Sequence, residues 1–408
     1  MVLHRLLKKA APRAVLALLI TSSAAQGATD TWKATASDNN FSNSANWTTT
    51  APGSGDTALF NSSSNFTSLT IGSTSQALNS LTFDTSAAAF IIGSTAGNGI
   101  ALSNGGTIQI ASTFSGTNLT ETINAPLTGF GASNSNNTYT FANNSSAANN
   151  DLLVIGGSIT SSNNGGHTTA ITFTGTGNGS VSGIISGSGG GLSVTKSGSG
   201  TWILTGSNTY TGGTTVSAGT LLVDDTSGSG TGTGSVTVSG TGTLGGTGTI
   251  SGPVTIQSGG TLNPGNSGAA GSAAAVGTLH TGALTLQSGS NSVFDVATPT
   301  NFDKVISSGA LNLGGNLNVN IASGQTFTQG QTLTLFSGTS ETGTFTGLAN
   351  NQVVYYDGYG FTADYTNTGF SLVAIPEPST WFAAALTLLA LGYTQRRKLV
   401  PALKLFRR

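Results

Sequence analysis

Few side chains in this sequence could do chemistry, and their surroundings limit what that chemistry could be. Asp224 and Asp225 are the only adjacent acids in the chain, and hard cations such as calcium prefer several oxygen ligands. The glycine-rich nonapeptide with regularly placed Asp, which marks calcium-binding β-rolls, does not surround them. His167 stands in a Gly-Gly-His-Thr turn with no second histidine nearby. The sequence therefore predicts solvated turns at these positions and no metal site.

Two further acids, Asp295 and Asp303, are the only carboxylates in one part of the C-terminal region. A glycosidase needs two carboxylates on facing sides of a cleft, and the sequence does not place them so. A polysaccharide lyase needs a basic residue to take a proton, yet residues 28–380 contain three lysines and no arginine. We therefore expect that the chain has no catalytic residues, binds no cofactor and is not an enzyme.

Aromatic side chains are the remaining candidates, because their rings can stack on sugars. Trp32, Phe41 and Trp47 lie among Asn and Ser near the N-terminus, and Tyr359 lies in an aromatic-rich C-terminal stretch. The favoured interpretation of the N-terminal rings is a cap over the open end of a core. The alternative is a glycan-stacking face formed by Trp32, Trp47 or Tyr359.

The composition limits how the body of the chain, the part between the two basic ends, can hold these residues in place. The chain has 408 residues, with 60 glycines, no cysteine and only 7% charged residues. A chain of this kind must be held by backbone ladders and stacked aliphatic side chains, because disulfides and dense ion pairs are excluded. Ten of the thirteen basic residues lie within residues 1–27 and 381–408, whereas all fourteen acids lie between them. The acidic body has no basic patch, which excludes nucleic acid as a partner.

A recurring triplet indicates how the body is built. Gly-Thr followed by an apolar residue begins at Gly200, Gly219, Gly242, Gly260 and Gly277, at intervals of 17 to 23 residues. This spacing is typical of a solenoid in which each coil adds a short strand to a parallel sheet. We therefore expect an all-β fold in which the side chains of Trp202, Leu221, Leu244 and Leu262 form one column.

The segment Gly198–Val223, GSGTWILTGSNTYTGGTTVSAGTLLV, resembles the autotransporter-associated β-strand repeat. The similarity lies in a GSGTW-apolar-LTG start, an NTYTGGT middle and an SAGTL end. It covers only this segment, although a looser coil pattern extends to either side. The resemblance implies a right-handed parallel β-helix on or outside a bacterial cell. A translocator barrel would need many more residues than follow the repeat here, so we expect that the resemblance does not extend to the export route.

Both termini read as targeting segments. Residues 1–27 have a basic start, a seven-residue apolar run and small residues, the pattern of a cleaved signal peptide. The C-terminal tail, residues 375–408, is similar to the PEP-CTERM sorting tail, with an apolar helix expected at about 381–395. The tail's motif is Pro376, Glu377 and Pro378, and its basic stop is Arg396, Arg397 and Lys398. The resemblance implies processing by an exosortase, a membrane transpeptidase; an ordinary membrane anchor is the alternative.

These segments divide the chain into five regions. They are a signal peptide (1–27), an N-terminal β-solenoid region with an aromatic cap (28–178), a β-helix core containing the repeat (179–280), a C-terminal β-strand region that caps the solenoid (281–374) and the sorting tail (375–408). The Asn-rich stretch Ala132–Asn150 is expected to be a protruding loop or a row of stacked asparagines at coil corners.

The leading functional hypothesis is therefore an exported, structural or adhesin-like protein of the cell envelope or extracellular matrix. Its precursor would be held at the inner membrane until an exosortase cleaves the tail. The alternative is a carbohydrate-binding surface protein with extracellular polysaccharide as its partner, and a β-helical polysaccharide-degrading enzyme is the least favoured hypothesis.

Overall fold

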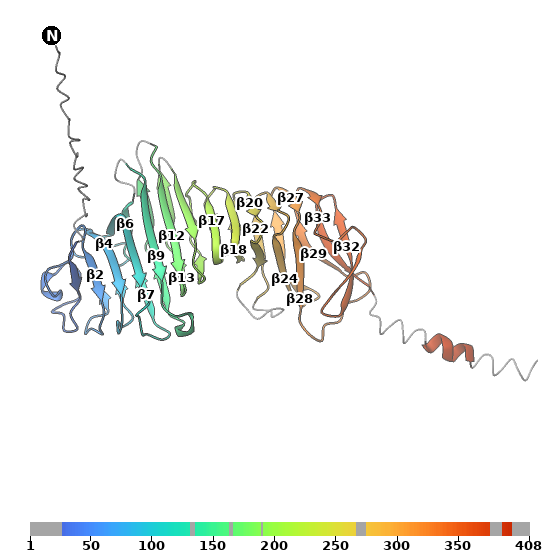
Figure 1. Cartoon of the computed structure of the whole chain (residues 1–408), viewed down its shortest axis with the longest axis horizontal. Coiled ribbons are helices and arrows are strands. Elements are labelled where there is room, and N and C mark those ends of the chain that lie inside the picture. Colours follow the sequence, from blue (N-terminus) through green and yellow to red (C-terminus); the bar gives the residue numbers. More distant parts are fainter. Residues whose placement is uncertain are drawn as a thin grey trace, which may run out of the picture.

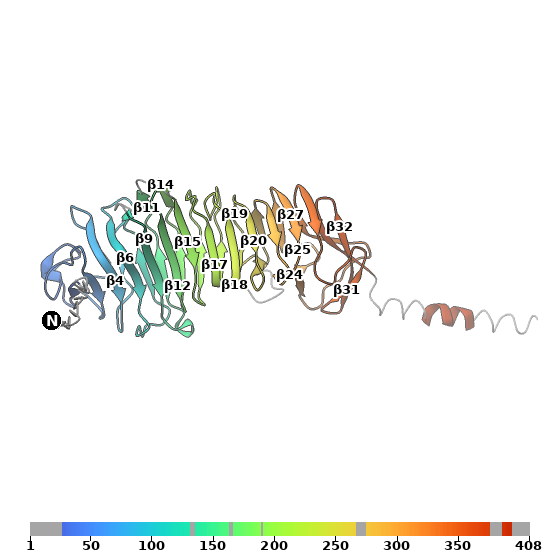
Figure 2. The same cartoon turned by 45° about the horizontal axis from the view of Figure 1, so that its top comes forward.

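The chain forms an elongated rod of stacked β-strands, seen from two directions in Figures 1 and 2. The computed structural model describes residues 27–130, 135–162, 166–188, 191–266, 275–375 and 386–393. The described chain enters at one end of the rod and leaves its β-structure at the other, with the strands following one another in sequence order between these ends.

Strand pairing shows that the rod is a parallel β-helix. In its middle every third strand pairs in parallel, because β9 pairs with β12, β10 with β13 and β11 with β14. In this stretch each coil therefore contributes one strand to each of three parallel sheets. This confirms the predicted all-β parallel solenoid; its right-handed winding stays a prediction.

The first sheet runs from end to end of the rod, with β1 (Thr29–Thr31) pairing at its beginning. Its strands are β2 (Thr57–Phe60), β4 (Gln76–Phe83), β6 (Ile100–Ile110), β9 (Asn137–Asn143), β12 (Thr169–Gly175), β15 (Leu192–Lys196), β17 (Thr214–Val223), β18 (Val236–Gly246), β20 (Val254–Ile256), β23 (Leu284–Leu286), β27 (Ala310–Leu313) and β30 (Ser340–Gly343).

The second sheet includes the C-terminal halves of β17 and β18, which bend from the first sheet into it. Its other strands are β3 (Ser68–Leu69), β5 (Ile91–Ile92), β7 (Thr120–Ile123), β10 (Leu152–Ile155), β13 (Asn178–Val181), β16 (Thr201–Leu204), β21 (Thr261–Pro264), β24 (Asn291–Thr298) and β28 (Asn316–Ile321). The short β25 (Asn301–Phe302) folds back against β24 in antiparallel fashion.

The third sheet is formed in two stretches. In the N-terminal stretch, the beginnings of β4 and β6 pair with each other, and β6 pairs with the next strand of the face. That stretch then contains β8 (Leu127–Phe130), β11 (Ile159–Ser162) and β14 (Ile185–Ser188), and the later stretch contains β19 (Thr249–Ile250), β22 (Thr278–Thr281), β26 (Lys304–Ser307) and β29 (Thr332–Ser337). The strands β11 and β14 lie along the upper edge in Figure 2.

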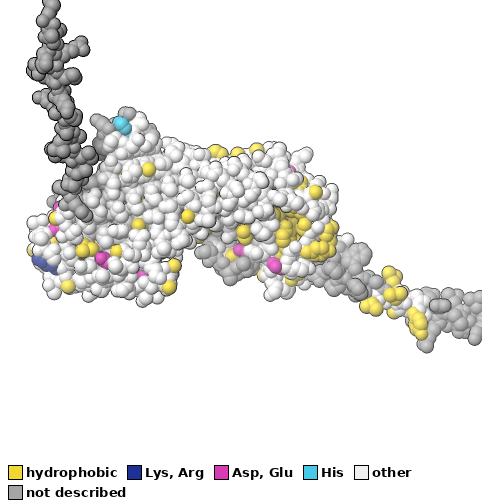
Figure 3. All heavy atoms as spheres, viewed as in Figure 1, with side chains coloured by type: hydrophobic (Ala, Val, Ile, Leu, Met, Phe, Trp, Pro, Cys, Tyr) yellow, Lys and Arg dark blue, Asp and Glu magenta, His cyan; other side chains and the backbone are white. Residues whose placement is uncertain are grey.

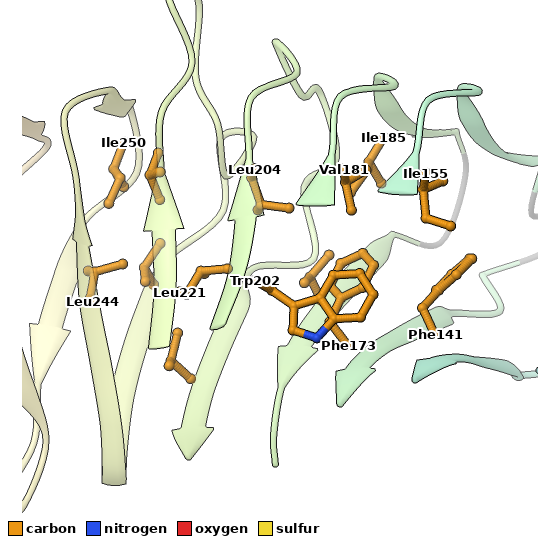
Figure 4. Close-up of a cluster of buried hydrophobic side chains, with 14 of the residues drawn as sticks. Phe141, Ile155, Phe173, Val181, Ile185, Trp202, Leu204, Leu221, Leu244 and Ile250 are labelled. Carbon is orange, nitrogen blue, oxygen red and sulfur yellow. The ribbon is translucent and has the colours of Figure 1, made fainter. Parts of the chain in front are cut away.

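Alternation of apolar and polar residues explains why these segments form strands. In β12 every second residue is buried and its neighbours are partly exposed, the pattern of a strand with one face in a core. The buried side chains of successive coils stack into columns (Figure 4). Phe173 and Trp202 approach with ring centroids 4.7 Å apart. Gly179 pairs with Trp202, and a Cβ on Gly179 would lie 2.6 Å from the indole, so only glycine fits beneath that ring.

The predicted column is confirmed in four coils. Trp202 pairs with Leu221, Leu221 with Leu244, and Leu244 with Leu262, and all four side chains are buried. The fifth triplet does not extend it, because Leu262 pairs with Ser292 in the next coil. Leu279 of that triplet pairs instead with Val305 in the third sheet.

The C-terminal end is closed by antiparallel strands, as predicted. After β29 the chain forms β31 (Val353–Tyr356), β32 (Tyr359–Thr366) and β33 (Gly369–Ala374), which pair in the order β29–β33–β32–β31. Asp357 and Gly358 form the β31–β32 turn, and both have positive φ. Antiparallel strands stop the parallel stacking, and their inward residues cover the last coil.

The middle of the Asn-rich stretch is a strand and not the predicted loop, whereas the alternative, asparagines stacked between coils, is present where Asn150 Nδ2 donates to Asn118 Oδ1 at 3.0 Å. The stretch contains β9, in which Asn137, Tyr139, Phe141 and Asn143 are buried. Asn143 is tolerated in the interior because its side-chain amide donates to the carbonyl oxygens of Asp151 and Asn178, at 2.9 and 2.7 Å.

Two short 3-10 helices, η1 (Ser44–Asn46) and η2 (Ala147–Asn149), lie in turns.

Beyond the rod, residues 386–393 form a helix whose leucines and Tyr393 are exposed. Among the described residues, no helix has the length and hydropathy that crossing a bilayer requires. The predicted signal peptide lies outside the described residues except for Gly27. Of the predicted membrane helix at about 381–395, residues 386–393 are described and helical, and the rest lies outside the described residues.

Candidate functional site

The N-terminal aromatic residues form the core of a cap. Trp32 and Trp47 are 1% and 0% exposed, and their ring centroids lie 5.1 Å apart in an edge-to-face arrangement. Phe41 and Phe60 pack against Trp47, and the indole N–H of Trp47 donates to the Phe41 carbonyl oxygen at 2.7 Å. Because neither indole presents a face to solvent, the structure places both tryptophans in the cap interior and not on the alternative glycan-stacking face.

The C-terminal aromatic residues are arranged differently, because some of their rings reach solvent. Tyr359 is partly exposed, with its ring edge-to-face on Phe327 at 5.2 Å. Tyr355 is 58% exposed and lies opposite Gly360 in the hairpin, where a Cβ would meet its ring at 3.1 Å. Val353, which is 47% exposed, lies on the same face of the hairpin as Tyr355, whereas Tyr359 pairs with Tyr356 on the opposite face, which packs against the core. Hydrophobic side chains gather at this end of the rod (Figure 3). We call Val353 and Tyr355 the cap patch.

The structure brings Asp295 and Asp303 together but buries both. Asp303 Oδ2 accepts a hydrogen bond from the Asp295 backbone N–H at 2.8 Å, and its Oδ1 accepts from Gly277 N–H at 2.7 Å. Asp295 Oδ1 accepts from Asn320 at 2.9 Å. The two residues are 5% and 0% exposed, respectively. Burial raises the pKa of Asp303 to about 7, and the nearby Asp295 carboxylate adds to that increase. These carboxylates hold a chain reversal between coils.

Asp224 and Asp225 join two coils through their side chains. Asp224 Oδ1 accepts from Thr247 N–H at 2.8 Å, and Asp225 Oδ1 accepts from Thr249 N–H at 2.9 Å. The predicted turn is present, but Asp225 is only 6% exposed, so it is not solvated as expected. Within the described ranges no group of three or more His, Cys, Asp or Glu side chains could hold a metal ion. His167 is partly exposed and lies between β11 and β12, outside any strand, as predicted for a loop residue.

Within the predicted repeat, Asn208 substitutes for a missing strand of the third sheet. Its Oδ1 accepts from Ile185 N–H at 2.7 Å in the preceding coil, and its Nδ2 donates to the Gly230 carbonyl oxygen at 2.6 Å in the following coil. One buried amide therefore continues the ladder across a coil that has no strand on this face. This explains the asparagine of the NTYTGGT motif.

Tyr210 and Thr214 complete the interior of the same motif. Tyr210 is fully buried, and its hydroxyl lies 2.7 Å from Thr214 Oγ1, which satisfies both groups. Gly213, at φ +84°, makes the turn that begins β17, where the sequence predicts one. The segments Thr214–Val216 and Thr220–Val223 form one bent strand, with a register shift between Val216 and Ala218.

Lys196 is a buried cation inside the repeat that sequence reasoning did not single out as special. It lies in register between Phe173 and Val216 and is 0% exposed. Its ammonium group donates to the carbonyl oxygens of Ser197, Gly198 and Ala218 at 2.8, 2.8 and 3.0 Å. Burial lowers the pKa of Lys196 to about 8. The side chain therefore satisfies carbonyls at the bend between two sheets, where ladder hydrogen bonds are interrupted.

Glu121 is a second buried ionisable residue that the sequence analysis did not single out. It occupies an inward position of β7, opposite Leu153, and is 0% exposed. Its Oε2 accepts from Phe90 N–H at 2.8 Å, but Oε1 has no partner. Burial raises the pKa of Glu121 to about 8, with a smaller contribution from Asp151. The alternation of inward and outward side chains along β7 could have identified Glu121 as a core position.

The third sheet also carries a shallow groove of about 280 Å³. It is lined by Thr249, Ile250, Ser251, His280, Thr281, Ile306 and Ser308. It contains no carboxylate and a single imidazole, so this arrangement lacks a pair of groups for acid–base catalysis. The sorting motif Pro376, Glu377 and Pro378 and the basic stop Arg396, Arg397 and Lys398 lie outside the described residues.

Comparison with known proteins identifies the repeat but not the whole chain. A family model for the passenger-associated-transport-repeat matches residues 194–223. This confirms the predicted autotransporter-type repeat, with a start four residues before Gly198. The match begins within β15 and covers β16 and β17 together with the Asn208 and Lys196 sites. No curated protein matches the chain.

Proposed function

We propose that this chain is an exported structural or adhesin-like protein of the cell envelope or extracellular matrix. The observation that carries the proposal is the coincidence of the transport-type repeat with three consecutive strands of a long parallel β-helix. Repeats of this type are similar to those of exported passenger proteins, and a rod held by backbone ladders needs no disulfides.

The finer part of the proposal concerns the termini. A cleaved signal peptide would deliver the rod outside the cytoplasm, and the tail would hold its precursor at the inner membrane. An exosortase-type transpeptidase would then act near Pro376, Glu377 and Pro378. Support for this step comes from the order of motif, apolar run and basic stop in the sequence.

The test is the intact mass of the protein recovered from cells that carry the matching secretion machinery. We expect one loss near residue 27 and a second near Pro376. A matched variant, Glu377→Ala, should keep its tail and remain with the membrane fraction, because the motif is altered while the apolar run is unchanged. Wild-type protein that retains both termini, or that stays in the cytoplasm, would contradict the proposal.

A second candidate function, carbohydrate binding, is favoured by the exposed ring of Tyr355 in the cap patch. Tyr355 lies across Gly360 with more than half of its surface free, and such a fixed ring can stack on a sugar face. We expect Tyr355→Ala to reduce retention on a glycan array several-fold, and Tyr359→Ala to reduce it less, because Tyr359 lies on the other face of the hairpin. The matched control is Thr366→Ala, an exposed residue at the opposite end of β32 from the patch, which should bind like wild type; equal loss in all three variants would refute a stacking site.

Degradation of polysaccharide remains the least favoured hypothesis. The only carboxylate pair that the sequence suggested is buried and occupied in backbone hydrogen bonds. Turnover of an acidic or neutral glycan by the purified chain, lost on Asp303→Asn, would reverse this ranking.

A further inference from the structure

A straight row of small polar side chains runs along the first sheet from one end of the rod to the other. Each member pairs in register with the member of the next coil, and none is buried. The row consists of Thr57, Ser80, Thr107, Thr140, Thr172, Thr195, Thr215, Thr237, Thr255, Thr285, Asn312 and Thr342. We call these residues the hydroxyl row.

The row is regular because the strands impose its spacing. Parallel strands lie about 4.8 Å apart, so one side chain recurs at that interval along the rod. Threonine has few χ1 rotamers, and its methyl group packs on the pleated surface, so the hydroxyls are held in similar positions. A side chain two positions before or after each member shares its face, and none of those positions holds Asp, Glu, Lys or Arg.

The central part of the row has hydrogen-bonding capacity that the described protein does not use. The side chains of Thr172, Thr195, Thr215, Thr237 and Thr255 make no hydrogen bond to another described residue. Each hydroxyl offers one donor and two acceptor lone pairs. In Figure 3, charged side chains are sparse on the middle of the rod, and most of that surface is neither charged nor hydrophobic.

We propose that the hydroxyl row binds a straight, neutral polysaccharide lying along the rod. Sugar hydroxyls both donate and accept, which matches the groups that threonine presents. A surface without charge has no Coulombic attraction for acidic polymers. Many equivalent weak contacts on one chain add through effective concentration, so no single pocket is needed. This inference rests on the proposed function, because the row meets such polymers only if the chain is exported.

The experiment measures retention of the purified full chain on three insoluble or immobilised polymers. Microcrystalline cellulose supplies straight neutral chains, amylose supplies helical neutral chains, and alginate supplies acidic chains. We expect retention on cellulose to exceed that on amylose and alginate. Retention on amylose or alginate equal to that on cellulose would overturn the proposal, as would no retention on cellulose.

Two sets of variants locate the binding face. The row set replaces Thr172, Thr195, Thr215, Thr237 and Thr255 with valine, which keeps the branched shape and removes the hydroxyl. The matched control set replaces Thr201, Thr220, Thr243 and Thr261, which pair in register on the second sheet, with valine. We expect at least about a tenfold loss of retention for the row set, because five hydroxyl contacts disappear together, and less than about a twofold loss for the control.

Equal losses in both sets would show that hydroxyl content, and not the row, causes retention, and would overturn the inference. Full retention by a row set that unfolds at the wild-type temperature would do the same. Loss on Tyr355→Ala alone would assign binding to the cap patch. The intact mass of exported protein is measured separately, so normal export without cellulose binding defeats this inference and leaves the proposed function standing.

Discussion

The two ends of the rod both carry aromatic clusters, but only the C-terminal cluster directs rings toward solvent. At the N-terminal end Trp32, Phe41 and Trp47 are at most 1% exposed. At the C-terminal end Phe345 and Phe370 are buried, with ring centroids 5.2 Å apart, whereas Tyr355 is 58% exposed.

The difference in exposure shows which aromatic side chains are needed to close the end of a solenoid and which are not. Either end coil would expose its apolar columns without a cover, and buried rings supply that cover at both ends. Exposed rings add nothing to closure, because they contact solvent and not the last coil. An aromatic residue near a solenoid end is therefore informative about binding only when its exposure is known.

The largest expected effect comes from removing a closing ring. Trp47→Ala deletes a fully buried indole and its hydrogen bond to Phe41, and should lower the free energy of unfolding by about 3–5 kcal/mol. Tyr355→Ala should change it by less than about 0.5 kcal/mol, because an exposed side chain loses few contacts. Chemical denaturation of both variants tests this, and similar destabilisation would erase the contrast between the ends.

The next effect is a loss of stability as the pH rises from about 4.5 to 8. The pKa of Glu121, in the N-terminal half, is raised to about 8, and that of Asp303, in the C-terminal part, to about 7. A carboxyl group whose pKa is higher in the folded state than in the unfolded state binds its proton more tightly when the protein is folded. Its contribution to stability is complete below the unfolded-state pKa and is lost as the pH rises through the folded-state pKa. We expect Glu121 to contribute about 1–4 kcal/mol across this window.

Glu121→Gln separates the contribution of the N-terminal half from that of the C-terminal part. The variant keeps an acceptor for Phe90 N–H but cannot ionise, so its melting temperature should vary less between pH 4.5 and 8. The remaining fall in melting temperature should end near pH 7, where the Asp303 carboxyl group loses its proton in the folded state. An unchanged pH profile would mean that Glu121 is already ionised in the folded protein.

A smaller effect of opposite sign is expected from the middle of the rod. The pKa of Lys196 is lowered from 10.5 to about 8, so the folded state binds this proton less tightly than the unfolded state. Stability should therefore rise again between about pH 8 and 10.5, which places a minimum near pH 8. In Lys196→Met, which keeps a long apolar side chain, the rise above pH 8 should disappear; its persistence would assign it to another group.

The sequence predicted the fold best where the coils are shortest. Between Thr172 and Thr255, register partners of successive coils are 18 to 23 residues apart, so the period is visible in the triplets. From Thr107 to Thr172 the interval is 32 or 33 residues, and from Thr255 to Thr285 it is 30. Longer turns hide the period there, and the triplet at Gly277, which continues the spacing in the sequence, places Leu279 in the third sheet and not in the column of Leu262.

Several details of the candidate sites could not be predicted from residue types alone. The asparagines around β9 suggested a loop, because their buried hydrogen bonds depend on coils that are distant in sequence. The exposure of Tyr355 and the burial of Trp32 could not be separated by residue type. The bridge made by Asn208 and the cage of carbonyls around Lys196 depend on neighbouring coils, so no local pattern announces them.

Because the described chain enters the rod at one end and leaves it at the other, the fold is also a spacer. The twelve members of the hydroxyl row define eleven intervals of about 4.8 Å, a span of roughly 50 Å. A tether that follows Ile375 would hold the cap patch beside the attached surface and lift the tryptophan cap about that distance away. Adding or deleting one coil would alter this standoff by a single strand spacing without disturbing either terminus.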